Sequence, residues 1–127
     1  MGAPHLTFFC ELDSQSLQSL FTDSLISELA GLKAAISLGI LDHSPERAEV
    51  VQRLNAAGIP VTAWLLLPRE QGYWFNLRNA DQAAESYAEL KRWTESNSLR
   101  WQAVGLDIEP DINELERLSA GKLRMLP

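Results

Sequence analysis

One unit recurs along this chain: an apolar run rich in β-branched and aromatic residues, then a polar turn, then a stretch whose apolar residues have helical spacing. The apolar runs cover residues 6–12, 35–41, 60–67 and 102–108. Their spacing suits βα units of about 30 residues. The runs do not alternate cleanly with polar residues, which is typical of strands covered on both faces in a parallel sheet. The pattern therefore predicts an α/β fold with four parallel strands.

The stretches between these runs carry helix start and stop signals. Ser44 predicts an N-cap, Pro45 the first helical residue after it, and Gly58 the end of that helix. Asn79 predicts the N-cap of the next helix, which we expect to bury Tyr87. These signals fall where helices of βα units belong.

Two further helical stretches are less regular. Thr22 begins a Thr-Asp-Ser segment that predicts a restart within the first helical region. Residues 112–118 predict a helix after the fourth strand, and Gly121 predicts its end.

The order of the units admits two architectures. A complete eight-stranded (β/α) barrel takes about 250 residues, whereas this chain has 127 residues and four units. We expect one domain over residues 1–127, a parallel (βα)4 half of a TIM-type barrel. A four-stranded open sheet with helices on both faces is the alternative.

An open half barrel has two exposed edges, the first and the fourth strand, with unpaired backbone groups. A partner is therefore expected to complete the sheet. Three explanations stay open: a second copy of the chain in a homodimer, a C-terminal half encoded elsewhere, or a truncated product.

Composition narrows the classes of partner. A net charge of −6 without a basic run argues against nucleic-acid binding. No segment approaches the ~18 apolar residues of a membrane span, and the N-terminus lacks the charged and apolar regions of a signal peptide. The lone Cys10 cannot form an intrachain disulfide, and its place in an apolar run predicts burial. We expect a cytoplasmic protein that binds a neutral or cationic small molecule.

Acidic residues follow three of the four predicted strands. If the strands are parallel, these residues gather at the C-terminal edge of the sheet, where ligands and catalytic groups lie in α/β folds. Asp107 and Glu109 project from the same face, about 6.6 Å apart along the strand. Asp42 also suits a turn or capping role. Glu11 and Glu109 favour a functional role, because Glu is a poor cap and costly to bury unpaired.

A long loop after the third strand, residues 68–79, places three successive aromatic residues next to these acids. Aromatic faces bind the apolar faces of sugar rings, and Tyr or Trp can also donate a hydrogen bond. Packing of the rings against the sheet is the alternative explanation. The predicted substrate-binding residues are Trp74, Tyr73, Trp64, Asp42, Arg69 and Asn76.

The segment Gly105-Leu-Asp-Ile-Glu109 resembles the fourth strand of chitinase-like (β/α)-barrel glycoside hydrolases, in which Asp-x-Glu closes the strand. Of the family's longer acidic motif, only Asp107 and Glu109 match. The resemblance implies a carbohydrate substrate, with Glu109 as the general acid and Asp107 orienting it and raising its pKa. A second carboxylate would act as nucleophile or base, and Glu11 is our candidate.

Two other functions stay open. Glu11, Asp42, Asp107 and Glu109 could hold Mg²⁺ or Ca²⁺ through oxygen ligands. A zinc site is not expected, because His43 is the only nearby imidazole and its place before a helix cap predicts a surface residue. The third possibility is a half barrel without catalysis that binds sugar or serves in assembly. No cofactor is otherwise expected.

Overall fold

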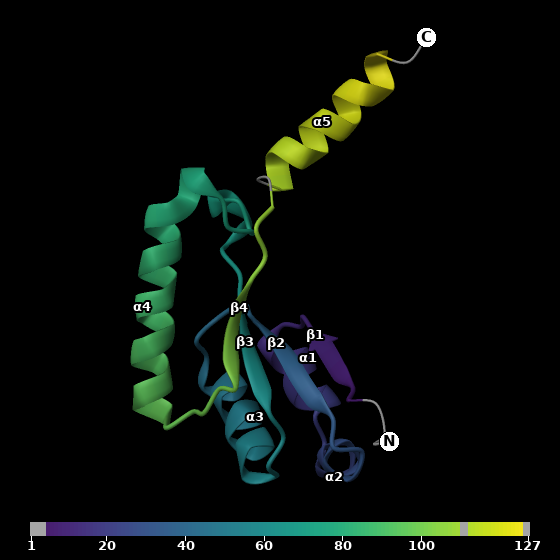
Figure 1. Ribbon diagram of the computed structural model, residues 1–127, viewed down its shortest axis with the longest axis vertical. Helices are drawn as coiled ribbons and strands as arrows, with labels where there is room; N and C mark the ends of the chain where they lie inside the picture. The colour runs from purple at the N-terminus through teal and green to yellow at the C-terminus, as the bar shows by residue number, and fades with distance from the viewer. Residues whose placement is uncertain (1–4, 110–111, 126–127) are drawn as a thin grey trace.

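The computed structural model describes residues 5–109 and 112–125, and its centre is a four-stranded sheet (Figure 1). The strands are β1 (Thr7–Cys10), β2 (Ala35–Ile40), β3 (Val61–Leu65) and β4 (Ala103–Leu106). All neighbours pair in parallel, in the order β1-β2-β3-β4. The predicted α/β class and the four parallel strands are confirmed. An open sheet of this order fits a half barrel.

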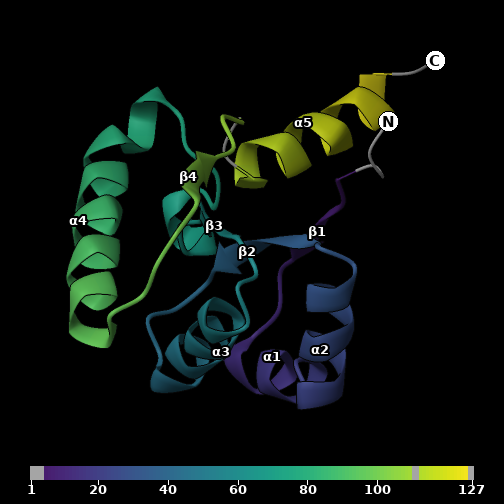
Figure 2. The same cartoon turned by 60° about the horizontal axis from the view of Figure 1, so that its bottom comes forward.

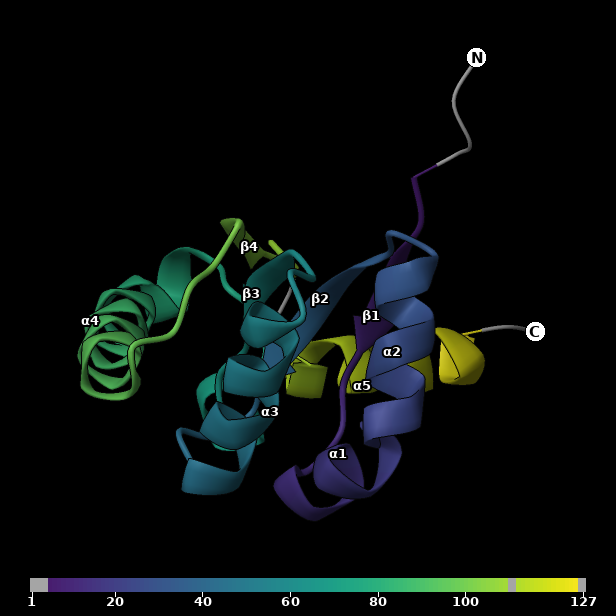
Figure 3. The same ribbon diagram turned by 90° about the horizontal axis from the view of Figure 1, so that it is seen from below.

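Helices α1 to α4 connect the strands and lie on the same side of the sheet (Figures 2 and 3). This placement follows from the strand order, because successive right-handed crossovers in one direction put every helix on one face. The helices are α1 (Ser14–Leu20), α2 (Asp23–Gly31), α3 (Pro45–Ala56), α4 (Ala80–Asn97) and α5 (Ile112–Met125), with short 3₁₀ turns η1 (Arg69–Gln71) and η2 (Leu77–Asn79).

The helix starts and stops follow the local sequence signals closely. The Ser44 hydroxyl accepts a hydrogen bond from the Arg47 N–H at 3.1 Å, with Pro45 as the first residue of α3. Gly58 has a φ of 74° just after that helix, a conformation that glycine adopts without strain. Thr22 caps α2 through Leu25 N–H. These predictions are confirmed.

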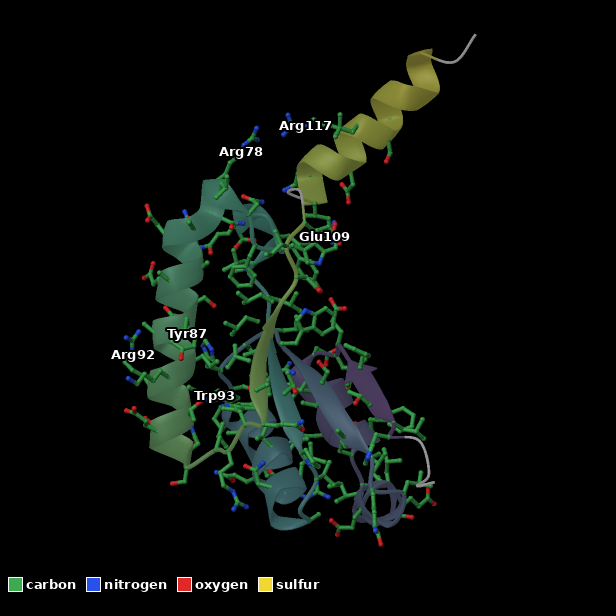
Figure 4. All side chains as sticks on the ribbon, viewed as in Figure 1. Arg78, Tyr87, Arg92, Trp93, Glu109 and Arg117 are labelled. Atoms are coloured by element: carbon green, nitrogen blue, oxygen red, sulfur yellow. The ribbon has the colours of Figure 1, made fainter. Side chains whose placement is uncertain are left out.

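Three details differ from the prediction. Tyr87 is 52% exposed, and Trp93 and Leu90 bury the sheet-facing side of α4 in its place (Figure 4). Asn79 lies at the N-cap position, but its side chain makes no cap bond to α4. Helix α5 continues through Gly121 to Met125, because one glycine inside a helix costs only about 1 kcal/mol.

The hydrophobic core lies between the sheet and helices α1 to α4. Alternate strand residues point into it, including Leu38 of β2 and Ala63 of β3, which are fully buried. Leu54 of α3 and Leu17 of α1 are buried against them. Cys10 is buried in the same core, as predicted. The core thus covers one face of the sheet, on the side of helices α1 to α4.

Helix α5 leaves the C-terminal end of the sheet and extends away from the other helices (Figure 1). Arg69 ties its first turns to the loop after β3, through an ion pair with Glu116 at 2.9 Å. Within the described residues, no helix has the length and apolar character needed to cross a membrane.

Candidate functional site

Among the residues that the structure describes, no helix packs on the face of the sheet opposite α1 to α4, called the open face below (Figure 3). The strand register places Phe9 of β1 beside Ser37 of β2. One row further toward the C-terminal end, Gly39 of β2, Trp64 of β3 and Gly105 of β4 lie side by side. Phe9 is 75% exposed. Small residues on β2 and β4 therefore leave space around the aromatic rings of β1 and β3.

That space forms a hollow of about 340 Å³, lined by Phe9, Ser37, Trp64, Gly105, Leu106 and Asp107. Phe9 and Trp64 meet edge to face, with ring centroids 6.2 Å apart. The Trp64 indole N–H is buried and has no hydrogen-bond partner within the described part of the chain. The hollow therefore combines two aromatic rings and one carboxylate.

Glu11 lies at the same edge of the open face, on the far side of the sheet from β4. Its Cγ is 3.5 Å from the position that a Cβ would take on Gly39, and Leu66 Cδ1 is 3.3 Å from that position. Gly39 therefore leaves room for the Glu11 side chain to lie over β2. The Glu11 carboxylate is exposed.

Asp107 and Glu109 continue β4 past its last regular residue, and the loop after β3 binds their backbone. Phe75 N–H donates to Asp107 O and Glu109 N–H donates to Phe75 O, both at 3.1 Å. Asp107 is half-buried and lines the hollow. Glu109 is exposed and lies where the chain leaves the sheet toward α5 (Figure 4). The two acids therefore occupy different depths, Asp107 within the hollow and Glu109 beyond its lining.

The loop of residues 68–79 is held in shape by Asn79. This buried side chain donates to Trp74 O at 2.7 Å and to Gln71 O at 3.1 Å, and it accepts from Asn76 N–H at 2.8 Å. Asn76 in turn donates to Glu109 O at 3.4 Å. These bonds explain why Asn79 makes no cap bond to α4: its amide organises the loop.

The predicted binding residues of this loop lie around the outer rim of the sheet. Tyr73 adopts a φ of 66° and stacks edge to face on Trp74, with centroids 5.5 Å apart. Both rings are half-buried. The guanidinium of Arg69 pairs with Glu116 of α5. The side chains of Arg69, Tyr73 and Trp74 do not line the hollow. Of the predicted site residues, the structure brings only Trp64 and Asp107 together there.

Asp42 is held by Arg47, a fully buried side chain of α3. Arg47 donates to Asp42 Oδ1 at 3.1 Å and also to the carbonyls of Gly39 and Leu12, at 3.0 and 2.8 Å. Partial burial alone would raise the pKa of Asp42, but hydrogen bonds from Arg47 and Ser44 outweigh it and lower the pKa to about 2. The Asp42 carboxylate therefore anchors the ends of β1 and β2.

A second pocket, of about 230 Å³, lies on the helix side between the end of β2 and α4. His43 lines it and stacks on Trp93, with ring centroids 5.3 Å apart, and its Nδ1 is 3.9 Å from Glu89 Oε2. Burial lowers the pKa of His43, while Glu89 and Asp42 act in the opposite direction. The side chain of His43 is 29% exposed, so it lies at the surface but is partly buried against Trp93.

The alternative of a metal site concerns the carboxylates of Glu11, Asp42, Asp107 and Glu109. Within residues 5–109 and 112–125, no three His, Cys, Asp or Glu side chains lie close enough together to hold a metal ion. One contributor to that hypothesis, Asp42, is bonded to Arg47 instead.

Sequence reasoning missed two residues that shape this region. Phe9 was read only as part of an apolar run, although its position two residues before Glu11 places both on one face of a strand. Arg47 was overlooked because charged residues on a helix are mostly exposed. Its spacing of four and seven residues from Val51 and Leu54, both buried, could have placed it on the core side.

Comparison with protein-family models, with curated proteins and with solved structures gave no match. The chemistry of the site therefore has to be argued from its own geometry.

Proposed function

We propose that this chain carries the greater part of a carbohydrate-cleaving site of the glycoside-hydrolase type, on the open face of a half (β/α) barrel. The observation that carries the proposal is the hollow on that face, in which Phe9, Trp64 and Asp107 meet. A sugar ring has apolar faces that stack on aromatic rings and hydroxyls that bond to carboxylates. A hollow of about 340 Å³ is at the small end of the range for ligand pockets.

In this proposal each acid has its own task. Asp107, inside the hollow, accepts hydrogen bonds from sugar hydroxyls and orients the ring. Glu109, exposed at the rim, protonates the leaving glycosidic oxygen as the general acid. The loop of residues 68–79 supports both, because its Phe75 is bonded to the backbone of Asp107 and Glu109. Tyr73 and Trp74 offer further stacking surfaces next to the rim for a longer saccharide.

Binding is tested by titrating the chain with chitotetraose and with cellotetraose while recording tryptophan fluorescence. Trp64→Ala should weaken binding about tenfold, since an aromatic contact contributes up to about 1.5 kcal/mol. The matched control is Trp101→Phe, because Trp101 packs on Trp93 away from the open face. Equal affinity of Trp64→Ala and the unsubstituted chain would contradict the placement of the sugar.

Catalysis is tested by release of reducing ends from the same saccharides. Glu109→Gln should lower kcat by about 10² to 10⁴-fold, the usual contribution of a general acid. Glu28→Gln, a change of an exposed acid on α2, should leave kcat unaltered. Unreduced activity of Glu109→Gln, with its circular dichroism intact, would reject Glu109 as the acid.

A sugar-binding module without catalysis is the second candidate. One observation favours it: Glu109 does not line the hollow in a single copy of the chain. It predicts saturable binding of a saccharide that Trp64→Ala weakens, with no turnover under conditions in which binding is complete.

A further inference from the structure

The two outer strands keep large apolar side chains uncovered on both faces of the sheet. On β1, Phe8 is 44% and Phe9 is 75% exposed, and on β4, Val104 is 41% and Leu106 is 53% exposed. Within the described residues, neither strand has a neighbour on its outer side. Exposed edges of this kind are templates for pairing with another strand.

Side-chain size alternates along the row of the open face that contains Trp64. Glu11, just after β1, lies beside Gly39 of β2, and this row continues with Trp64 of β3 and Gly105 of β4. Alternating large and small residues let the facing side chains of a closed barrel interdigitate. The strand that continues this alternation beyond β4 must carry a large residue, as β1 does. Gly105 has space for it, since the nearest atom to an added Cβ is Thr62 Cγ2 at 3.6 Å.

We infer that a second copy of this chain docks at these edges, β4 of each copy beside β1 of the other, and that the partner's Glu11 completes the acidic site. Two sheets of four parallel strands then form a ring of eight, the strand number of (β/α) barrels. A two-fold axis along the ring makes the two junctions identical, so the assembly closes at two copies.

The distance across the sheet explains why a second copy is needed for chemistry. In one copy Glu11 is three strand spacings, about 14 Å along the sheet, from the end of β4, which Asp107 and Glu109 follow. The paired carboxyl groups of glycoside hydrolases are about 5–9.5 Å apart. Across the junction the partner's Glu11 lies one spacing, about 4.8 Å, from the end of β4. The role of the partner's Glu11 rests on the proposed function, whereas the assembly does not.

Helix α5 gains a place in the same assembly. In a (β/α) barrel the helix that follows a strand packs over that strand and the next one. Val104 and Leu106, on the helix side of β4, lack such a cover. Leu118 of α5 is 60% exposed. To cover the junction between β4 and the neighbouring β1, α5 would fold back over β4 and release the Arg69–Glu116 ion pair.

Native mass measured by light scattering tests the assembly. At about 100 µM, the 127-residue chain should have a mass of 28.4 kDa, twice the 14.2 kDa of one copy. A mass of 14.2 kDa at every concentration up to that value would overturn the inference.

Two variants test the geometry of the junction. Phe9→Asp places a charge where the ring is closed and should give the single-copy mass. Its fold should persist, because this side chain is mostly exposed in one copy. The control Leu77→Asp changes a residue that is 98% exposed on η2 and should leave the dimer intact. Gly105→Lys, on the other side of the junction, should also dissociate it. A dimer that resists both Phe9→Asp and Gly105→Lys would reject this interface.

Mixing two inactive variants tests the shared site. Glu11→Gln and Glu109→Gln should each be inactive, but an equal mixture should recover about a quarter of the unsubstituted activity. In that mixture, half of the dimers contain one copy of each variant, and each such dimer has one intact site of two. No recovery between two dimeric variants would reject the partner's Glu11. A dimer without activity on any saccharide would reject the proposed function and leave the ring standing.

Discussion

The two faces of the sheet share one backbone and have opposite surroundings. On the helix side, Leu38 is fully buried under α1 and α3, and Arg47 ties the ends of β1 and β2 together. On the open face, Phe9 of the neighbouring strand is largely exposed, and Trp64 lines a hollow. Since large exposed apolar surface on a folded domain marks sites of interaction, we assign stability to the helix side and propose the open face as the site of interaction.

Removal of Arg47 should disturb the helix side most. Arg47→Met leaves the carbonyls of Gly39 and Leu12 without their donor and Asp42 without its counter-charge. The expected loss is about 3–5 kcal/mol of unfolding free energy, measured by urea denaturation. The matched change on the same helix is Arg53→Met, which loses an ion pair with the exposed Asp23 and a hydrogen bond to Phe21 O and should cost about 1–2 kcal/mol. Equal losses of unfolding free energy for Arg47→Met and Arg53→Met would contradict the special role of the buried Arg47.

Truncation of one apolar residue on each face compares the faces directly. Leu38→Ala should cost about 2–5 kcal/mol, because a cavity is left in a filled core. Phe9→Ala should cost no more than about 0.5 kcal/mol in dilute protein. In the proposed eight-stranded dimer Phe9 is buried, and assembly stabilises the folded chain by mass action. The cost of Phe9→Ala should therefore grow with protein concentration. A large cost of Phe9→Ala that is independent of concentration would contradict an open face.

Acid should weaken the helix side through Asp42. Its pKa is about 2 in the folded chain against 3.8 as the ordinary value, so the unfolded chain binds more protons at low pH. The stabilisation is therefore complete above about pH 5 and is lost as the pH falls toward 2. Because the Asp42 side chain is 39% exposed, screening limits the effect to about 1 kcal/mol. Thermal melting between pH 5 and 2.5 should show a shallower loss for Asp42→Asn; an unchanged slope would count against this role.

The helix side was predictable and much of the open face was not. Ser44, Pro45 and Gly58 mark their helix because capping depends on neighbouring residues alone. The strands followed from apolar runs in the same way. The hollow depends on which residues of four separate strands share a row, so Phe9 and Gly105 acquire their role only through the register. Arg47 was missed as an organiser because it binds backbone carbonyls of other segments. Asn79 was missed because it binds backbone carbonyls of its own loop, for which sequence carries no mark.

We infer that a second copy completes the open face and its edges. Gln102 N–H donates to Val61 O of β3, so strand alternation directs the N–H of Gly105 to the outer edge, and the same rule directs that of Phe9 outward on β1. Amide hydrogen exchange at these two residues, measured by NMR at about 100 µM, reports directly on pairing at both edges. Paired edges should show protection at least about 100-fold above that of an open strand edge. Rapid exchange at Phe9 and Gly105, with Leu38 and Ala63 protected, would contradict the inference.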